Sequence, residues 1–285
     1  MRHHGRPVTD QLVPARPLRV RGLFQIDRKA LIELLLALSP GEWSRPTVCT
    51  AWDVRDVALH ILGGDLSNLS RRRDGLATET WGPDEDPGAF LARVNDAWVV
   101  TGRRLSPRVI IELLIASGPA LFASFDTLDP DVPGGPVSWA GRGPAPVWLD
   151  LAREYMERWV HQQHIRDAVG RPGQTAAQFV RPVIAASMHA LPVTMERHAG
   201  NARGAVVVEV RGDAGGRWSV LTEGDRWRLF EGAAADPRTR ITVAADDWWR
   251  LVTLGLGREE AWARAQVDGD ADLARAALAA VAIIA

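Results

Sequence analysis

The sequence has little of several features that mark particular classes of protein. It contains a single cysteine, Cys49, which excludes a disulfide within the chain and favours a reducing compartment. Its 34 basic and 35 acidic residues leave a formal net charge of −1, which gives no general attraction for nucleic acid or an anionic membrane. No run approaches about 18 uninterrupted apolar residues, and no apolar segment follows the arginines of residues 1–22. We therefore expect no membrane span and no signal peptide, and a cytoplasmic location.

Lysine is also nearly absent, since Lys29 is the only one and arginine supplies the remaining basic residues. This bias is typical of a GC-rich bacterial genome. With 285 residues, of which 46% are hydrophobic and 24% charged, the chain is long enough for one or two domains, each with a full core.

The first two thirds of the sequence have the period of α-helices. Apolar residues recur every three or four positions from Leu23 to Leu38, and Asp53 is a good N-cap for a second helix, which contains His60. Further helices are predicted at about 88–104, 107–125, 147–169 and 175–199.

After Arg203 the period changes to that of β-strands. Strands are predicted at 205–210, 218–222, 226–230 and 239–243, and helices at about 245–255, 258–265 and 270–284. The sequence therefore predicts a flexible leader over 1–22, a helical bundle over 23–200 and a small α+β domain over 203–285.

Two residues of the predicted helix 147–169 could bind one metal ion. Glu157 and His161 are four positions apart, so their side chains lie on the same face of the helix. His60 could supply a third ligand from another helix of the bundle. Two histidines and one carboxylate leave coordination positions open on zinc. Such a spacing also occurs by chance, usually as an exposed pair, and a single histidine is usually a satisfied residue at a helix edge.

The segment before and around His60 resembles the signature of the mycothiol-dependent maleylpyruvate isomerase family. The matching residues are Pro46, Thr47, Cys49, Trp52, Val54, Asp56, His60 and Gly63. A second element of the family, Glu-x-x-x-His, matches Glu157 and His161. Residues 242–246 and 267–270 resemble the family's small C-terminal domain. The resemblance implies a DinB-like four-helix bundle followed by a sterol-carrier-like α+β domain.

The resemblance also implies a function. His60, Glu157 and His161 would bind zinc or another divalent metal, and mycothiol would serve as a thiol cosubstrate. The enzyme, of actinobacterial origin, would isomerise a small electrophile or transfer the thiol to it, without a nucleic acid or membrane partner. A non-enzymatic protein that binds a small molecule and keeps a structural or vestigial metal is the main alternative, and hydrolysis by a zinc-bound water is another.

Two further residues remain open. Cys49 has no residue near it in the sequence that could act as a base on its thiol, so a structural thiol is favoured over a catalytic one. His164 stands where many relatives of the resembled family have aspartate. It could be a hydrogen-bond partner of a ligand, an alternative ligand or a surface residue. Its Cα would lie about 10 Å along the helix from that of Glu157, so we do not expect both to bind the same ion.

Overall fold

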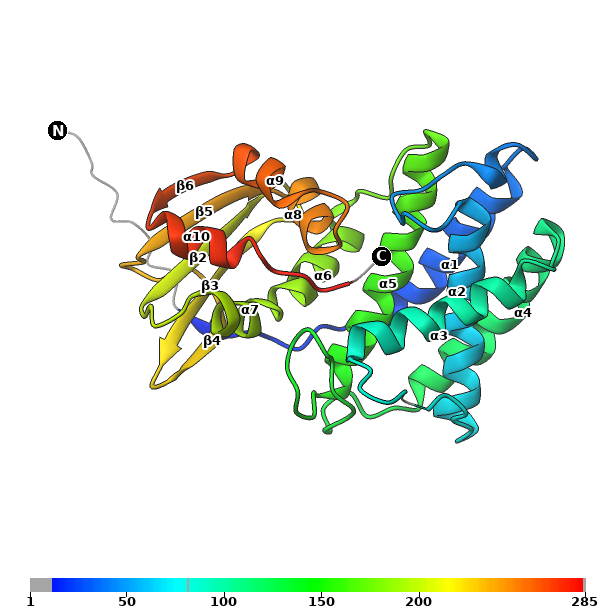
Figure 1. Ribbon diagram of the computed structural model, residues 1–285, viewed down its shortest axis with the longest axis horizontal. Coiled ribbons are helices and arrows are strands. Elements are labelled where there is room, and N and C mark those ends of the chain that lie inside the picture. The colour runs from blue at the N-terminus through cyan, green and yellow to red at the C-terminus, as the bar shows by residue number, and fades with distance from the viewer. Residues whose placement is uncertain (1–11, 81, 284–285) are drawn as a thin grey trace. The chain divides into compact units, whose positions relative to one another are not determined.

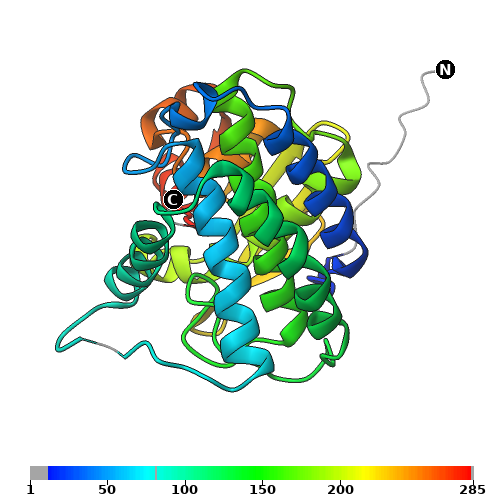
Figure 2. The same cartoon turned by 90° about the vertical axis from the view of Figure 1, so that its right-hand side faces the viewer.

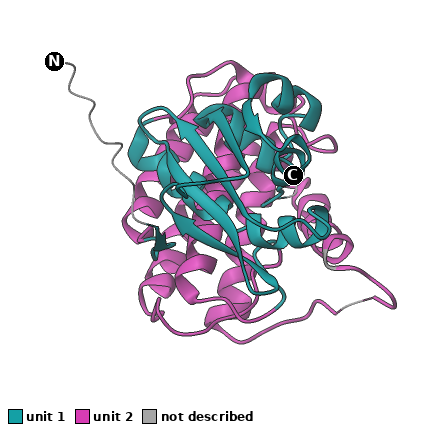
Figure 3. Cartoon of the chain, turned by 90° about the vertical axis from the view of Figure 1, so that its left-hand side faces the viewer, with its two compact units in different colours: residues 1–18, 139–142, 176–283 teal, residues 19–138, 143–175, 284–285 magenta. Residues whose placement is uncertain are grey.

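The computed structural model describes residues 12–80 and 82–283, which form two compact units (Figures 1 and 3). The helical unit comprises Arg19–Ser138 and Gly143–Thr175. The sheet unit comprises residues 12–18, Trp139–Arg142 and Ala176–Ile283. The predicted fold class, a helical bundle followed by a smaller α+β part, is confirmed.

Four long helices of the helical unit pack as a bundle, and a fifth lies against one of them (Figure 2). The bundle contains α1 (Arg21–Leu36), α2 (Val54–Asn68), α4 (Pro107–Asp126) and α5 (Val147–Val169), while α3 (Pro87–Gly102) packs on α2. A short 3₁₀ turn (Glu42–Ser44) precedes α2, and a π-helical turn (Leu69–Arg73) follows it. The five helices predicted for this region are confirmed to within a few residues.

The ends of these helices follow from local side chains. Asp53 caps α2, because its carboxylate accepts a hydrogen bond of 2.9 Å from the backbone N–H of Asp56. Helix α5 ends at Gly170, whose φ of 66° is a left-handed conformation that glycine adopts without strain. Gly63 permits a close approach of α2 to α3, because a Cβ atom there would lie 2.7 Å from Cβ of Trp98.

Charged side chains lie inside the bundle. Arg28 on α1 donates to Asp65 on α2 at 2.7 Å, and Arg158 on α5 donates to the other carboxylate oxygen at 3.0 Å. Arg158 also donates to Glu154 at 2.6 Å, and the hydroxyl of Ser117 donates to Asp65 at 2.7 Å. We call these five residues the buried ion network; it connects α1, α2, α4 and α5.

The sheet unit has one six-stranded sheet in the order β1-β4-β3-β2-β5-β6. Strands β2 and β5 are parallel, and every other neighbouring pair is antiparallel. The strands are β1 (Val13–Pro14), β2 (Ala205–Arg211), β3 (Gly216–Glu223), β4 (Arg226–Glu231), β5 (Thr239–Ala244) and β6 (Gln266–Gly269). The helices are α6 (Ala177–Met188), α7 (Leu191–His198), α8 (Ala245–Val252), α9 (Arg258–Arg264) and α10 (Ala271–Ala277).

Three features of this unit differ from the sequence prediction. The predicted helix 175–199 is two helices, α6 and α7, with a break at 189–190. Both belong to the sheet unit, because α6 packs on α8 and α7 packs on β4 and α10, so the units divide at Ala176 rather than near 200–203. The last predicted helix ends at Ala277 rather than near 284.

The predicted flexible leader, residues 1–22, also differs from the structure over its described residues, 12–22. Residues 1–11 lie outside the described residues. Val13 and Pro14 pair with β4, and Arg16 forms an ion pair with Glu231 at its end. Helix α1 already begins at Arg21. The second half of the segment 1–22 is therefore ordered by pairing with the sheet.

Helix α4 is, among the described residues, the one helix long and apolar enough to cross a membrane. Of its most apolar stretch, 44% is buried within the structure, and it packs against α1 and α2. Both properties are typical of a helix in the core of a bundle.

Candidate metal centre

A tight loop, residues 45–53, positions the side chains of Cys49 and Trp52 at the end of the bundle. The hydroxyl of Thr47 donates to the carbonyl of Trp52 at 2.8 Å and accepts from the N–H of Cys49 at 3.2 Å. The N–H of Trp52 donates to the carbonyl of Cys49 at 2.8 Å. The loop buries Cys49 and places the Trp52 ring 4.9 Å from the ring of His60, centroid to centroid. These contacts explain why Thr47, Cys49 and Trp52 stand at fixed spacing before His60.

The three residues predicted as metal ligands lie together. His60 comes from α2, and Glu157 and His161 come from successive turns of α5. Oε2 of Glu157 lies 3.2 Å from Nε2 of His161, and the two imidazole rings are 4.6 Å apart in an edge-to-face arrangement. One donor atom from each residue lies within 4.8 Å of the others. The chain therefore brings two nitrogens and one carboxylate oxygen to one point.

The charges of these three residues depend on one another. Burial alone would raise the pKa of Glu157, but hydrogen bonds to His161 and His60 hold it well below its ordinary value. Burial lowers the pKa of His60 more than Glu157 raises it. Burial also acts to lower the pKa of His161, but hydrogen bonds to Cys49 and Glu157 raise it to about 9. The site thus combines an anionic carboxylate with one buried and one partly exposed imidazole.

The exposure of the three side chains is uneven. The side chain of Glu157 is 27% exposed, whereas that of His161 is 2% exposed. His60 is also partly exposed, so a small molecule would reach the donor atoms from the side of Glu157 and His60, while His161 closes the inner side.

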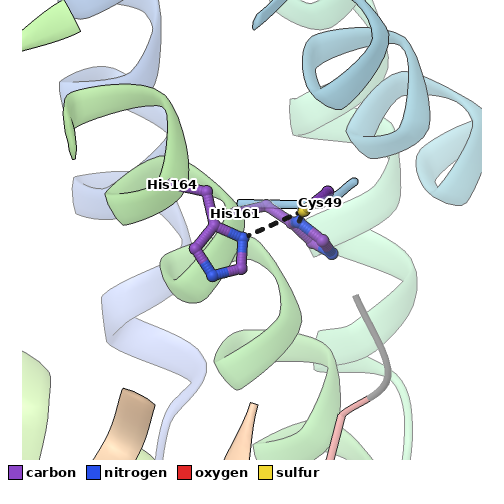
Figure 4. Close-up of side chains that lie close together, drawn as sticks. All are labelled: Cys49, His161 and His164. Atoms are coloured by element: carbon purple, nitrogen blue, oxygen red, sulfur yellow. Dashed lines mark hydrogen bonds between the residues drawn. The ribbon is translucent and has the colours of Figure 1, made fainter. Parts of the chain in front are cut away.

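The structure bears on the two residues that the sequence leaves open, Cys49 and His164. Cys49 is close to two bases, since its sulfur lies 3.3 Å from Nδ1 of His164 and 4.0 Å from Nδ1 of His161 (Figure 4). His164 is 1% exposed, so it is not a surface residue. The sequence gave no sign of this contact, because Cys49 and His164 are 115 positions apart.

Helix α9 has an arginine at each end, Arg258 and Arg264. In the sheet unit Arg264 is occupied by ion pairs with Asp247 and Glu260. Arg258 lines a cavity of about 400 Å³, together with His198, Trp262 and Arg275. This cavity lies entirely within the sheet unit.

Comparison with known proteins supports the resemblance. Residues 25–166 match the family model of the mycothiol maleylpyruvate isomerase N-terminal domain. Among curated proteins no sequence matches this chain. The crystal structure of the mycothiol-dependent maleylpyruvate isomerase matches with a TM-score of 0.53 at 12% identity, over 84% of this chain and 90% of that chain. The structure of a histidine-to-alanine mutant of that protein gives the same values.

A further match is the sterol carrier protein domain 2 of Helicoverpa armigera, at 20% identity over 33% of this chain and 80% of that chain, with a TM-score of 0.28. The two isomerase structures share this chain's fold, and the family model covers the loop with Cys49, all of α2, and α5 as far as Arg166. Through its helical unit, the chain belongs to the mycothiol maleylpyruvate isomerase N-terminal domain family.

Proposed function

We propose that this protein is a metal-dependent enzyme that uses a low-molecular-weight thiol, mycothiol, to isomerise a small electrophile of the maleylpyruvate type. The observation that carries the proposal is the convergence of His60, Glu157 and His161 within 4.8 Å of one another. Family membership and the fold shared with the isomerase support it.

The donor atoms fit zinc or another borderline divalent ion. Two donors on one tetrahedral zinc ion lie about 3.3 Å apart, and Nε2 of His161 lies 3.2 Å from Oε2 of Glu157. Two nitrogens and one oxygen leave a position for an external ligand, whereas a structural zinc is normally closed by four protein ligands. The site thus supports an enzyme better than a vestigial metal.

A zinc ion bound there would lower the pKa of a coordinated thiol, so that thiolate would be present at neutral pH. The residues of this chain supply the rest of the environment. Cys49 contacts the inner nitrogen of His161 and fixes the orientation of that ring. Trp52 packs on His60 and limits its rotation. Glu157 and His60, the two partly exposed donors, are on the side from which a thiol can enter.

The reaction needs no other covalent partner. Addition of the thiolate to an activated double bond converts it to a single bond, rotation follows, and elimination returns the trans isomer together with the thiol. If elimination does not occur, the same addition ends as transfer of the thiol to the electrophile. Isomerase and S-transferase therefore need the same site and differ in the fate of the adduct.

The experiment compares the full-length wild-type protein with His60→Ala, Glu157→Gln and, as a control, Glu112→Gln, an exposed glutamate of α4. We measure metal content and the isomerisation of maleylpyruvate with and without mycothiol. The wild-type protein and the control should hold about one metal ion and be active only with the thiol. Both ligand variants should lose most of the metal and at least about 100-fold in activity, since two ligands rarely hold zinc tightly.

Full metal content in both ligand variants would contradict the metal site. A wild-type protein that holds its metal but shows no thiol-dependent isomerisation or thiol transfer would contradict the enzymatic role.

A further inference from the structure

A second set of donor atoms shares His161 with the first and is drawn in Figure 4. It consists of the sulfur of Cys49 and one ring nitrogen each of His161 and His164, all within 4.8 Å of one another. Each of the three residues is at most 2% exposed. Unlike the set with Glu157, this one contains a thiol and no carboxylate, so its chemistry is softer.

The distances suit a bound ion. With zinc–sulfur and zinc–nitrogen bonds of about 2.3 and 2.0 Å, a tetrahedral ion places its sulfur and nitrogen donors about 3.5 Å apart. The sulfur of Cys49 lies 3.3 Å from Nδ1 of His164 and 4.0 Å from Nδ1 of His161. A shift of about half an ångström would bring the sulfur to a bonding separation from both nitrogens.

The positions of the donors are fixed by the fold rather than by chance. Cys49 is set by the loop 45–53, whose backbone is held by the hydroxyl of Thr47. His161 and His164 are three residues apart on α5 and therefore project from the same face. A buried cluster with two imidazoles and a thiol is preorganised for a cation, and no chain movement is needed to assemble it.

His161 belongs to both sets through its two nitrogens. Nε2 lies 3.2 Å from Glu157, and Nδ1 faces Cys49. We propose that Cys49, His161 and His164 form a second metal site, selective for a soft, thiol-seeking ion such as Cd²⁺ or Cu⁺, beside the site of His60 and Glu157. Binding releases the thiol proton and one ring proton of His161 to solvent, because a cysteine or histidine ligand must be deprotonated at the atom that binds the metal.

The test uses Cd²⁺ alone, added to the metal-free full-length protein, and therefore does not depend on the proposed enzymatic activity. Ultraviolet difference absorption detects the charge transfer from thiolate to cadmium, and ¹¹³Cd NMR reports whether sulfur is a ligand. The wild-type protein should show both signals at about one equivalent. His60→Ala should keep them, because it removes a donor of the other set only.

Cys49→Ser should abolish the thiolate signals, and His164→Gln should lower the affinity for Cd²⁺ at least about 10-fold. Absence of the thiolate signals in the wild-type protein would overturn the proposal, whether or not any variant folds. Loss of the signals in His60→Ala, with its circular dichroism unchanged, would also overturn it, because the ion would then depend on the first set.

Discussion

The helical unit and the sheet unit bury different kinds of polar group. Among the described residues, all buried charged side chains lie in the helical unit, together with buried asparagine, glutamine and histidine. The buried polar residues of the sheet unit all carry hydroxyl groups: Ser187, Thr194, Ser219, Thr239, Thr242 and Thr253. Both units have an extensive apolar core, so the difference is not one of overall hydrophobicity.

The kinds of buried polar group indicate how each unit determines the arrangement of its helices and strands. A charge in the interior costs free energy unless a partner and hydrogen bonds satisfy it. In the helical unit Asp65 accepts from Arg28 and Arg158, so these charges are satisfied only when α1, α2 and α5 meet in one arrangement. In the sheet unit the hydroxyl of Ser219 bonds only to the backbone, at Gly232 and Ala234. We infer that polar contacts define the helix arrangement that holds the candidate metal centre, whereas the sheet relies on its backbone ladder and apolar burial.

The largest effect should come from breaking the buried ion network. Arg158→Met removes one of the two arginines that donate to Asp65 and the buried arginine that donates to Glu154. It should lower the free energy of unfolding of the helical unit by about 3–5 kcal/mol. Hydrogen exchange of individual peptides measures the loss in each unit separately, which a single unfolding transition would not. Protection should fall in α2 and α5 and stay unchanged in β2–β5.

The matched change in the other unit is Ser219→Ala, which removes one buried hydroxyl and should cost about 1 kcal/mol, confined to the sheet. If Arg158→Met leaves the protection of α5 at its wild-type value, the buried charges do not determine the helix arrangement.

The next effect concerns pH and Asp27 on α1. Burial raises the pKa of this carboxyl to about 7 from its ordinary value of 3.8, although Arg28, Arg158 and Arg166 act in the opposite direction. Between these values the folded chain keeps a proton that the unfolded chain has lost. The contribution of Asp27 to stability is therefore full below about pH 4, declines as the pH rises and is lost above about pH 7.

Asp27→Asn removes this titration. The stability of the helical unit in the wild-type protein should fall, relative to the variant, by on the order of 2–4 kcal/mol between pH 4 and pH 8. Hydrogen exchange of α1 at several pH values measures the difference, and Asp126→Asn, an exposed carboxylate of the same unit, is the control. A constant difference between wild-type and Asp27→Asn across this range would show that Asp27 is ionised inside the bundle.

The smallest loss of stability should come from removing a helix N-cap, and it should be the same in both units. Asp53 caps α2 and Asp270 caps α10, each by accepting hydrogen bonds from backbone N–H groups of the first turn. Asp53→Ala and Asp270→Ala should each cost about 1 kcal/mol in their own unit. Hydrogen exchange of individual peptides during thermal or chemical unfolding measures the loss of stability in each of the two variants. A large inequality between them would mean that the units differ in their helix ends as well as in their interiors.

Most of the secondary structure could be predicted from the sequence, because apolar periodicity and end residues such as Asp53 and Gly170 are local. Features that depend on distant parts of the chain could not. Strand β1 has two residues and pairs with β4, more than 200 positions away. The break between α6 and α7 follows no glycine, but Pro192 in the first turn of α7 is a local signal for it that the sequence prediction did not use.

The candidate metal centre was predicted in part for the same reason. The spacing of Glu157 and His161 is local to one helix, and the resemblance added His60, so these three residues were found. The contact of Cys49 with His161 and His164 joins a loop to a helix more than 100 positions away. No local sequence pattern in either segment predicts this contact. The charges of the buried ion network are equally hidden, because Arg28 and Asp65 have the same sequence pattern as solvent-exposed helix residues.

Helix α5 has a consequence for how this protein could diverge. Of its 23 residues 16 are buried, and they include Glu154 and Arg158 of the ion network as well as His161 and His164. A substitution on this helix meets a packing contact, a buried charge or a candidate metal donor at most positions, so few would survive selection. Descendants of this chain that acquire a new substrate should therefore differ mainly in the connecting segments 74–86 and 127–146, while α5 keeps its sequence.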